Sequence, residues 1–305
     1  MKAKRKILYP ESLYLILFGI LSVGIGKGVG SVEQTTLSYF GRKPPGLIPG
    51  CFAPGIVSLD SRSEIGPSFS EDGKKLYFRV KKTLFVSELK GEMWSDPVET
   101  SLPGKIEAGL LPTISADGCT YTVCRNGDVY LGKKEGDSFQ EAEIMKPVSS
   151  EAYECGVSIA SNGNAYFGSQ REGTKGHCDI FFSEYRNGIY LPPVNIEILN
   201  THLSECKAFV APDESYLIFT SVGREDGYGS TDMYISFRGE NNHWSSPVNM
   251  GKDFNGEYAE EPVTLSPDGK YFFFLKASKR GDNLQFDIYW VDSSALLQLR
   301  SGIDQ

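Results

Sequence analysis

The chain has 305 residues, of which 40% are hydrophobic and 12% aromatic, which is enough to bury a large core. Its 33 glycines and 16 prolines indicate a turn-dense fold and exclude general disorder, because aromatic strands separate them. The net charge is −8, and the remainder is more acidic still because residues 1–30 are basic. Nucleic acid is therefore excluded as a favoured partner, since an acidic surface repels phosphate backbones.

The N-terminus combines a basic head with an apolar run. Four of residues 2–6 are basic, and a mostly apolar segment follows from Leu13 to Ile25. This order is typical of an export signal over residues 1–30, either cleaved or kept as an anchor. The segment is short for a spanning helix, which needs about 20 residues. We predict a periplasmic or extracellular protein that contacts the membrane only through this N-terminal segment. A linker at residues 31–49 follows the segment.

Five acidic or amide-containing turns recur along the rest of the chain, each between two short strands. They are Asp72-Gly73, Asp117-Gly118, Asn162-Gly163, Asp213-Glu214 and Asp268-Gly269. Successive turns lie 45, 45, 51 and 55 residues apart. A strand-rich repeat of roughly 40–50 residues indicates sheets repeated around an axis, which is a β-propeller.

Each repeat is predicted to form a four-stranded antiparallel blade. The first strand places an apolar residue three positions before the turn, between small residues, as in Ser68-Phe69-Ser70. The alternation suits an innermost strand, where blades crowd toward the axis. The second strand is aromatic-rich, and the third usually starts at an aspartate. The fourth begins near a proline, a residue tolerated on edge strands because it lacks an N–H.

The last repeat predicts how the propeller closes. After Asp287–Val291 no fourth strand follows, only a segment at 294–300 that we expect to form a short helix. Residues 52–58, before the first repeat, resemble an orphan fourth strand. We predict that they complete the final blade, giving an all-β propeller of five blades over residues 50–293 with a tail at 294–305. Six blades remain the alternative count.

Three segments resemble the TolB-like, WD-like propeller repeat. They are Pro-Ser-Phe-Ser-Glu-Asp-Gly-Lys-Lys-Leu-Tyr-Phe at 67–78, Leu-Ser-Pro-Asp-Gly-Lys-Tyr at 265–271 and Asp-Ile-Tyr at 287–289. The resemblance covers about residues 50–292, and its specificity comes from repetition. Family propellers are often six-bladed, so five is a departure. The resemblance implies an exported propeller, commonly without known catalysis, and implies a fold more securely than an activity.

A glutamate recurs eight residues before the turn in four repeats: Glu64, Glu154, Glu205 and Glu260. In the second repeat this position is Gly109, with Glu107 nearby. An arginine recurs after the second strand: Arg125, Arg171, Arg224 and Arg280. Blade topology predicts that both sets lie at one mouth of the central channel, where they could bind Ca²⁺, a sugar or a peptide terminus. In the alternative, each glutamate tethers its own blade through backbone N–H groups or a neighbouring arginine.

These residues favour a non-catalytic propeller that binds a protein, peptide or glycan at its acidic mouth, with no cofactor. The first alternative is a glycosidase-like enzyme, which would need two differentiated carboxylates about 5–10 Å apart. No single acid is distinguished from its repeats, so no catalytic residue is assigned. The second alternative is an envelope scaffolding domain, which would carry an exposed apolar patch.

The six cysteines contain no Cys-x-x-Cys motif. Cys155 and Cys206 occupy the same position in adjacent repeats, and Cys178 is expected on the same face. One hypothesis is a disulfide from Cys155 to Cys178 or to Cys206, which suits an exported domain. Another is a zinc site made by these cysteines and a histidine, and a third is free buried thiols.

Overall fold

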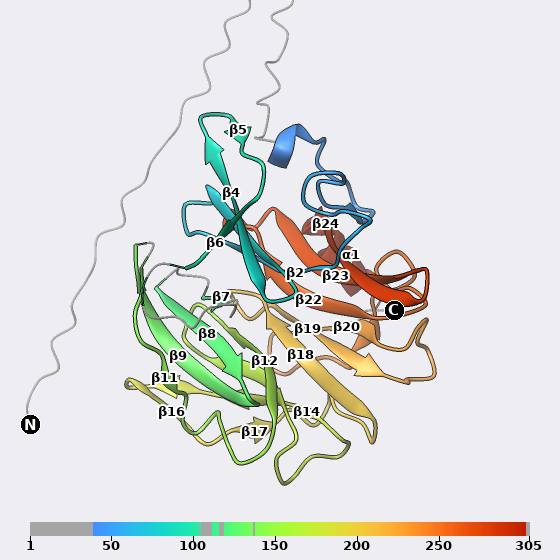
Figure 1. Cartoon of the computed structure of the whole chain (residues 1–305). Helices are drawn as coiled ribbons and strands as arrows, with labels where there is room; N and C mark the ends of the chain where they lie inside the picture. The colour runs from blue at the N-terminus through green and yellow to red at the C-terminus, as the bar shows by residue number, and fades with distance from the viewer. Residues whose placement is uncertain (1–38, 103, 105–111, 116–118, 137, 303–305) are drawn as a thin grey trace, which may run out of the picture. The chain divides into compact units, whose positions relative to one another are not determined.

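The computed structural model describes residues 39–102, 104, 112–115, 119–136 and 138–302. They form a nearly all-β unit of five antiparallel blades, which confirms the predicted β-propeller (Figure 1). The described part of the chain has no helix long and apolar enough to cross a membrane. The predicted export segment at 1–30 lies outside the described residues.

The strands of each blade pair antiparallel with their neighbours. Blade 1 has β2 (Glu64–Phe69), β3 (Lys75–Val80), β4 (Thr83–Lys90), β5 (Met93–Trp94) and β6 (Val98–Thr100). Blade 2 has β7 (Thr113–Ile114), β8 (Thr120–Arg125), β9 (Asp128–Glu135), β10 (Ser138–Phe139) and β11 (Glu143–Ile144). Blade 3 has β12 (Glu154–Ile159), β13 (Ala165–Ser169), β14 (Asp179–Ser183) and β17 (Val194–Asn195), with a side hairpin of β15 (Tyr185–Arg186) and β16 (Ile189–Tyr190).

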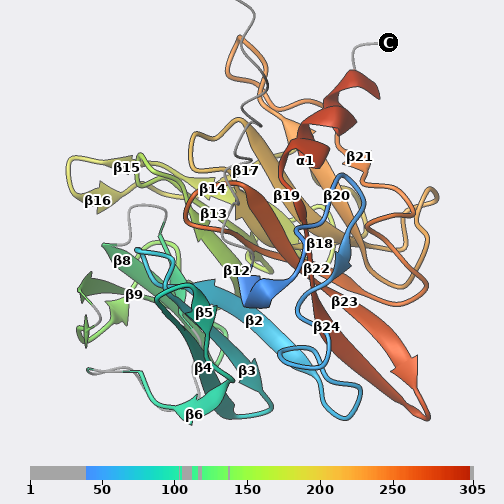
Figure 2. The ribbon, with the colours of Figure 1, turned by 90° about the horizontal axis from the view of Figure 1, so that it is seen from above.

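The remaining two blades follow the same plan. Blade 4 has β18 (Ser204–Val210), β19 (Tyr216–Val222), β20 (Asp232–Phe237) and β21 (Val248–Asn249). Blade 5 has β22 (Glu260–Leu265), β23 (Tyr271–Arg280), β24 (Asn283–Asp292) and β1 (Gly50–Cys51). Figure 2 shows β2, β12, β18 and β22 toward the centre, with β6, β16 and β21 toward the outside. The short outer strands β6, β17 and β21 each begin directly after a proline, as predicted for edge strands.

The second strands of blades 1, 3, 4 and 5 are apolar at consecutive positions because both of their faces are buried. In blade 2, β8 supplies Tyr121 and Val123 to the interface with blade 1, and β9 supplies Val129 to the interface with blade 3. In β3, Leu76 and Phe78 pack toward blade 5, whereas Tyr77 packs toward blade 2. Successive side chains of a strand point to opposite faces, so a continuous apolar run serves two interfaces. Five apolar clusters result, one between each pair of neighbouring blades, including the pair formed by blades 5 and 1.

The repeated turns have positive φ at their second residue, with values of 68° at Gly73, 89° at Gly163 and 70° at Gly269. The backbone N–H of Gly73 bonds to the carbonyl of Ser70 at 2.9 Å, so the loop spans four residues. In blade 4 the equivalent residue is Glu214, which adopts φ 59° without being glycine. The turn at 117–118 lies outside the described residues.

The ring closes as predicted, but the closing strand begins earlier than expected. β1 pairs with β24, with Gly50 opposite Trp290 and Cys51 opposite Tyr289. The prediction that residues 52–58 form this strand is wrong. Only the N–H of Phe52 extends the pairing, to the carbonyl of Ile288, because the chain then turns at Ala53, where φ is 44°.

Both ends of the described chain pack onto the blades. Tyr39, in the 3₁₀ helix η1 (Tyr39–Gly41), lies 5.5 Å between ring centroids from Phe69 and 5.9 Å from Trp290, which belong to blades 1 and 5. At the other end, the expected short helix is present as α1 (Ser294–Gln298), followed by η2 (Leu299–Gly302). Helix α1 buries Ala295 and Leu296 against the cluster between blades 4 and 5.

Candidate functional site

The glutamates of blades 3 and 4 are fully buried and have the same set of partners. Glu154 accepts hydrogen bonds from the N–H and Oγ of Ser150, from Ser169 Oγ at 2.9 Å and from Arg171 Nη2 at 3.1 Å. Glu205 accepts the equivalent hydrogen bonds from the N–H of Thr201, from Thr201 Oγ1 at 2.8 Å, from Ser221 Oγ at 2.9 Å and from Arg224 Nη2 at 3.0 Å. These are the contacts expected if each glutamate tethers its own blade.

The arginines of these two blades complete the tether. The Arg224 guanidinium lies 4.6 Å from the ring centroid of Tyr234 and also bonds the carbonyl of Leu199 at 2.6 Å. Arg171 likewise lies 5.0 Å from the ring centroid of Phe167 and donates to the carbonyl of Val148. Each arginine therefore joins the inner strand, the aromatic second strand and the connection from the preceding blade.

Blade 1 reaches the same arrangement with an arginine from a different sequence position. Arg62 Nε bonds Glu64 Oε1 at 2.6 Å, and its guanidinium lies over the rings of Phe78 and Phe85. Because Glu64 is buried, its pKa rises to about 7, although the hydrogen bond and charge of Arg62 oppose the rise. The sequence pattern did not identify Arg62 because this arginine precedes the glutamate.

Blade 5 lacks the tether. Arg280 instead bonds Asp287 at 2.8 Å and Asp60 at 3.2 Å, so Glu260 pairs with no arginine in the described part of the chain. Among the described residues neither Glu260 carboxylate oxygen has a hydrogen-bond partner within ordinary hydrogen-bond geometry, although the nearby Gly256 N–H lowers the pKa of Glu260 in part. Burial raises the pKa of Glu260 to about 7, and the charge of Lys276 lowers it only in part.

In blade 2 only the arginine can be placed. Arg125 lies 4.3 Å from the ring centroid of Tyr130, while Gly109 and Glu107 lie outside the described residues. The structure thus pairs Glu154 with Arg171 and, separately, Glu205 with Arg224. It does not pair Glu260 with Arg280. The four glutamates are 0% exposed, and ligand binding by these eight mouth residues stays a prediction.

Two kinds of tethering residue escaped the sequence pattern. Asn200 bonds the N–H and C=O of Ile180, and Asn255 does the same for Met233, fixing the outer connection onto the third strand. Ser149 has this role for Val129. Each lies five residues before the position of the repeated glutamate, so the recurring spacing was a usable signal.

Glu214 is the second kind, because it replaces the turn glycine and links blades 3 and 4. Its carboxylate accepts hydrogen bonds from Tyr166 at 2.7 Å and Asn164 at 2.8 Å, both in blade 3, and pairs with Arg238 of its own blade. Burial alone would raise the pKa of Glu214, but these hydrogen bonds and the arginine hold it below its ordinary value.

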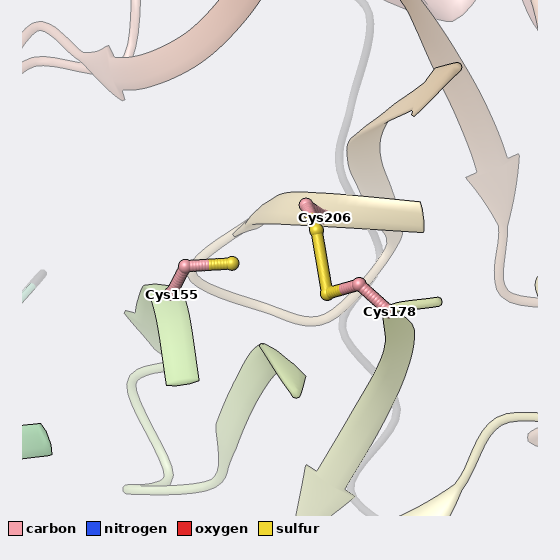
Figure 3. Close-up of side chains that lie close together, drawn as sticks. All are labelled: Cys155, Cys178 and Cys206. Carbon is pink, nitrogen blue, oxygen red and sulfur yellow. A yellow bond between two sulfur atoms is a disulfide. The ribbon is translucent and has the colours of Figure 1, made fainter. Parts of the chain in front are cut away.

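The cysteines form a cluster between blades 3 and 4. A disulfide joins Cys178 to Cys206 with a Cα–Cα separation of 6.1 Å (Figure 3). The two predicted pairings, Cys155 with Cys178 or with Cys206, are therefore wrong. Cys155 stays free, although its sulfur lies within 4.8 Å of the other two and points toward Cys206 in Figure 3. No histidine of the described residues joins this group.

A cavity of about 210 Å³ opens within the channel, at the end where the first strands meet their turns. All five inner strands bound it. Its described lining mixes hydroxyl groups, including those of Ser68, Thr113, Ser158 and Thr264, with apolar chains such as Leu265. Glu71 is the one carboxylate among the described lining residues, so the repeated glutamates do not reach this cavity.

No protein-family model matches the chain, and no curated protein matches it. Among solved structures it is similar to a protein described as TolB from Agrobacterium tumefaciens, at 16% identity and a TM-score of 0.49, covering 77% of this chain and 78% of that one. It is also similar to an endo-arabinase from Bacteroides thetaiotaomicron, at 11% identity and a TM-score of 0.46, covering 76% and 95%. A third similar structure is prolyl oligopeptidase B from Galerina marginata, at 17% identity and a TM-score of 0.38, covering 76% of this chain and 32% of the enzyme.

The paired glutamates predict a loss of stability on neutralisation. We expect Glu205→Gln to lower the free energy of unfolding by about 3 kcal/mol, because Arg224 then lacks its buried counter-charge. Urea unfolding followed by tryptophan fluorescence measures the change. Glu197→Gln is the matched control, since Glu197 forms an exposed ion pair with Lys175 at 3.8 Å and should change stability little. Equal losses in the two variants would contradict the tether.

Glu260→Gln, unlike Glu205→Gln, should raise the free energy of unfolding at pH 8. Folded Glu260 keeps its proton up to about pH 7, whereas the ordinary value is 4.5, so the folded state binds more protons between these values. Stability should therefore fall as pH rises from about 4.5 to 7. The glutamine amide resembles the protonated acid, so the variant should not show the loss of unfolding free energy that Glu260 causes as pH rises. At pH 8 it should be up to about 3 kcal/mol more stable than the wild type.

Unfolding of the wild type and Glu260→Gln at pH 4, 6 and 8 measures this difference. Glu257→Gln, an exposed neighbour, is the control and should follow the wild type at all three pH values. A Glu260→Gln variant that is less stable than the wild type at pH 8 would show that the carboxylate is ionised and stabilised in the folded protein.

Proposed function

We propose that this chain is a non-catalytic binding module that takes an apolar or hydroxyl-bearing side chain of a protein or peptide ligand into its channel cavity. The observation that carries the proposal is that the inner strands of all five blades bound this cavity. Its volume of about 210 Å³ suits one or two side chains, because pockets for whole small molecules are typically about 300–1,000 Å³. Apolar walls with a few hydroxyl groups suit such a side chain.

The lining favours binding over glycoside hydrolysis. That reaction needs two carboxylates on opposite sides of a sugar. Glu71 alone supplies a carboxylate from the described lining, and the buried mouth glutamates Glu154 and Glu205 are occupied by arginines. A glycan bound without cleavage is a separate outcome that the experiment below distinguishes.

We further propose that the module works in a periplasmic or extracellular compartment. The basic and then apolar order of residues 1–25 supports export. The Cys178–Cys206 disulfide supports it independently, because stable disulfides are typical of oxidising compartments. The protein would then meet its ligand in the cell envelope or outside the cell.

A peptide array and a glycan array probed with the full chain test the proposed function. We expect peptide hits whose affinity falls by about tenfold or more in Thr113→Trp, because the exposed Thr113 lines the cavity and an indole would fill it. Val98→Trp places the same side chain on the exposed outer strand β6 and should keep the hits.

Other outcomes of the same arrays contradict the proposal. Hits that Thr113→Trp keeps and a Glu154→Gln/Glu205→Gln double variant loses, while its tryptophan fluorescence shows it to be folded, would return binding to the acidic mouth. Hits confined to glycans would replace the peptide ligand with a carbohydrate. Hits that Val98→Trp abolishes and Thr113→Trp keeps would place binding on the outer edge of blade 1.

A further inference from the structure

The three-sulfur cluster between blades 3 and 4 has more ligand atoms than a structural disulfide needs. Cys155 lies on the inner strand β12, Cys206 on the inner strand β18, and Cys178 just before β14. Their sulfur atoms all lie within 4.8 Å of one another. Three metal–sulfur bonds of about 2.3 Å in a trigonal arrangement place the sulfurs about 4 Å apart, which this spacing accommodates.

Gly168 leaves room beside these sulfurs. It lies in the middle of β13, directly opposite Cys155, where glycine is unfavourable for a strand. A Cβ at this position would lie 3.0 Å from Cys155 Sγ and 3.1 Å from Cys178 Sγ, closer than ordinary contact. A side chain here would therefore crowd the two sulfurs and restrict their movement toward a shared ligand.

We propose that reduction of the Cys178–Cys206 disulfide opens a three-thiolate site for Cu(I) at Cys155, Cys178 and Cys206. A dithiol reductant supplies the two electrons and two protons that convert the disulfide into two thiols, and is itself oxidised to a disulfide. Cu(I) then replaces the thiol protons, releasing up to three of them. The site is closed in the oxidised chain, where only Cys155 keeps a thiol.

The number and type of ligands select this cation. Thiolates favour soft ions such as Cu(I) and Zn(II), but structural zinc sites use four ligands. The described residues supply three, since neither His177 nor His202 joins the group. Lys207 lies close enough to interact electrostatically with Cys155, so its charge offsets part of the negative charge of the thiolates. Cys206 is partly exposed, whereas Cys155 and Cys178 are buried.

The test uses the full chain, reduced with excess dithiothreitol and then freed of it under anaerobic conditions. Cu(I) is offered as its complex with the chromophoric chelator bicinchoninate, and the loss of the chelator's absorbance counts the ions transferred. We expect one tightly bound ion per reduced chain and none in the oxidised chain. Cys155→Ser should weaken binding by about 100-fold or more, because it removes one of three thiolates.

Two further variants make the result specific. Cys119→Ser removes an exposed thiol outside the cluster and should bind as the wild type does. Gly168→Ala should weaken binding while all six cysteines remain. Binding by Cys155→Ser within threefold of the wild type, or equal losses in Cys155→Ser and Cys119→Ser, would overturn the proposal. So would a reduced wild type that leaves the ion with the chelator.

Discussion

The structure depends on the burial of both faces of every blade. A strand such as β3 has apolar side chains at consecutive positions, so each blade must have a neighbour on both sides. A linear stack would leave two of these faces in water. The contact between blades 5 and 1, with Phe52, Phe273 and Trp290 at its centre, removes that exposure. Closure is thus a requirement of the apolar pattern and not an addition to it.

Buried ion pairs then fix how each blade attaches to the chain before it. In blades 3 and 4 one buried carboxylate accepts hydrogen bonds from an arginine, from a serine of the second strand and from a residue of the preceding connection. Such a network is costly to break and holds one geometry. As a result, the carboxylates of Glu154 and Glu205 are already bound by side chains of the protein. We therefore propose the channel cavity, lined by hydroxyl and apolar groups, as the place for a ligand.

The sequence was sufficient to predict the propeller, its five blades and the identity of the closing blade, because the turns and alternating strands repeat five times. It misplaced the closing strand, since a two-residue strand such as β1 has no periodicity to detect. The disulfide partner was also missed, because Cys155 and Cys206 occupy equivalent positions before the bulge in β12 and β18, so the repeat pattern does not distinguish which of them bonds Cys178.

The candidate site was less predictable than the fold. The recurrence of glutamate and arginine predicted the tethers at Glu154 and Glu205, yet Arg62 replaces the expected partner in blade 1 and Arg280 turns to Asp287 in blade 5. Repeats share a backbone position more strictly than a side-chain partner, and one inserted residue changes which atoms can meet. The cavity depends on five segments that are far apart in sequence, so no local pattern reports it.

Head-to-tail closure can be tested by a disulfide between β1 and β24. Cys51 and Tyr289 face each other as a pair without backbone hydrogen bonds, since Phe52 and Ile288 form the neighbouring bonded pair. Such pairs have Cα atoms about 4.5 Å apart, within the range of a disulfide. Oxidised Tyr289→Cys should yield a tryptic peptide linking residues 51 and 289 and should unfold at higher urea than Tyr289→Ser. Absence of that linked peptide in the folded protein would contradict the closed ring.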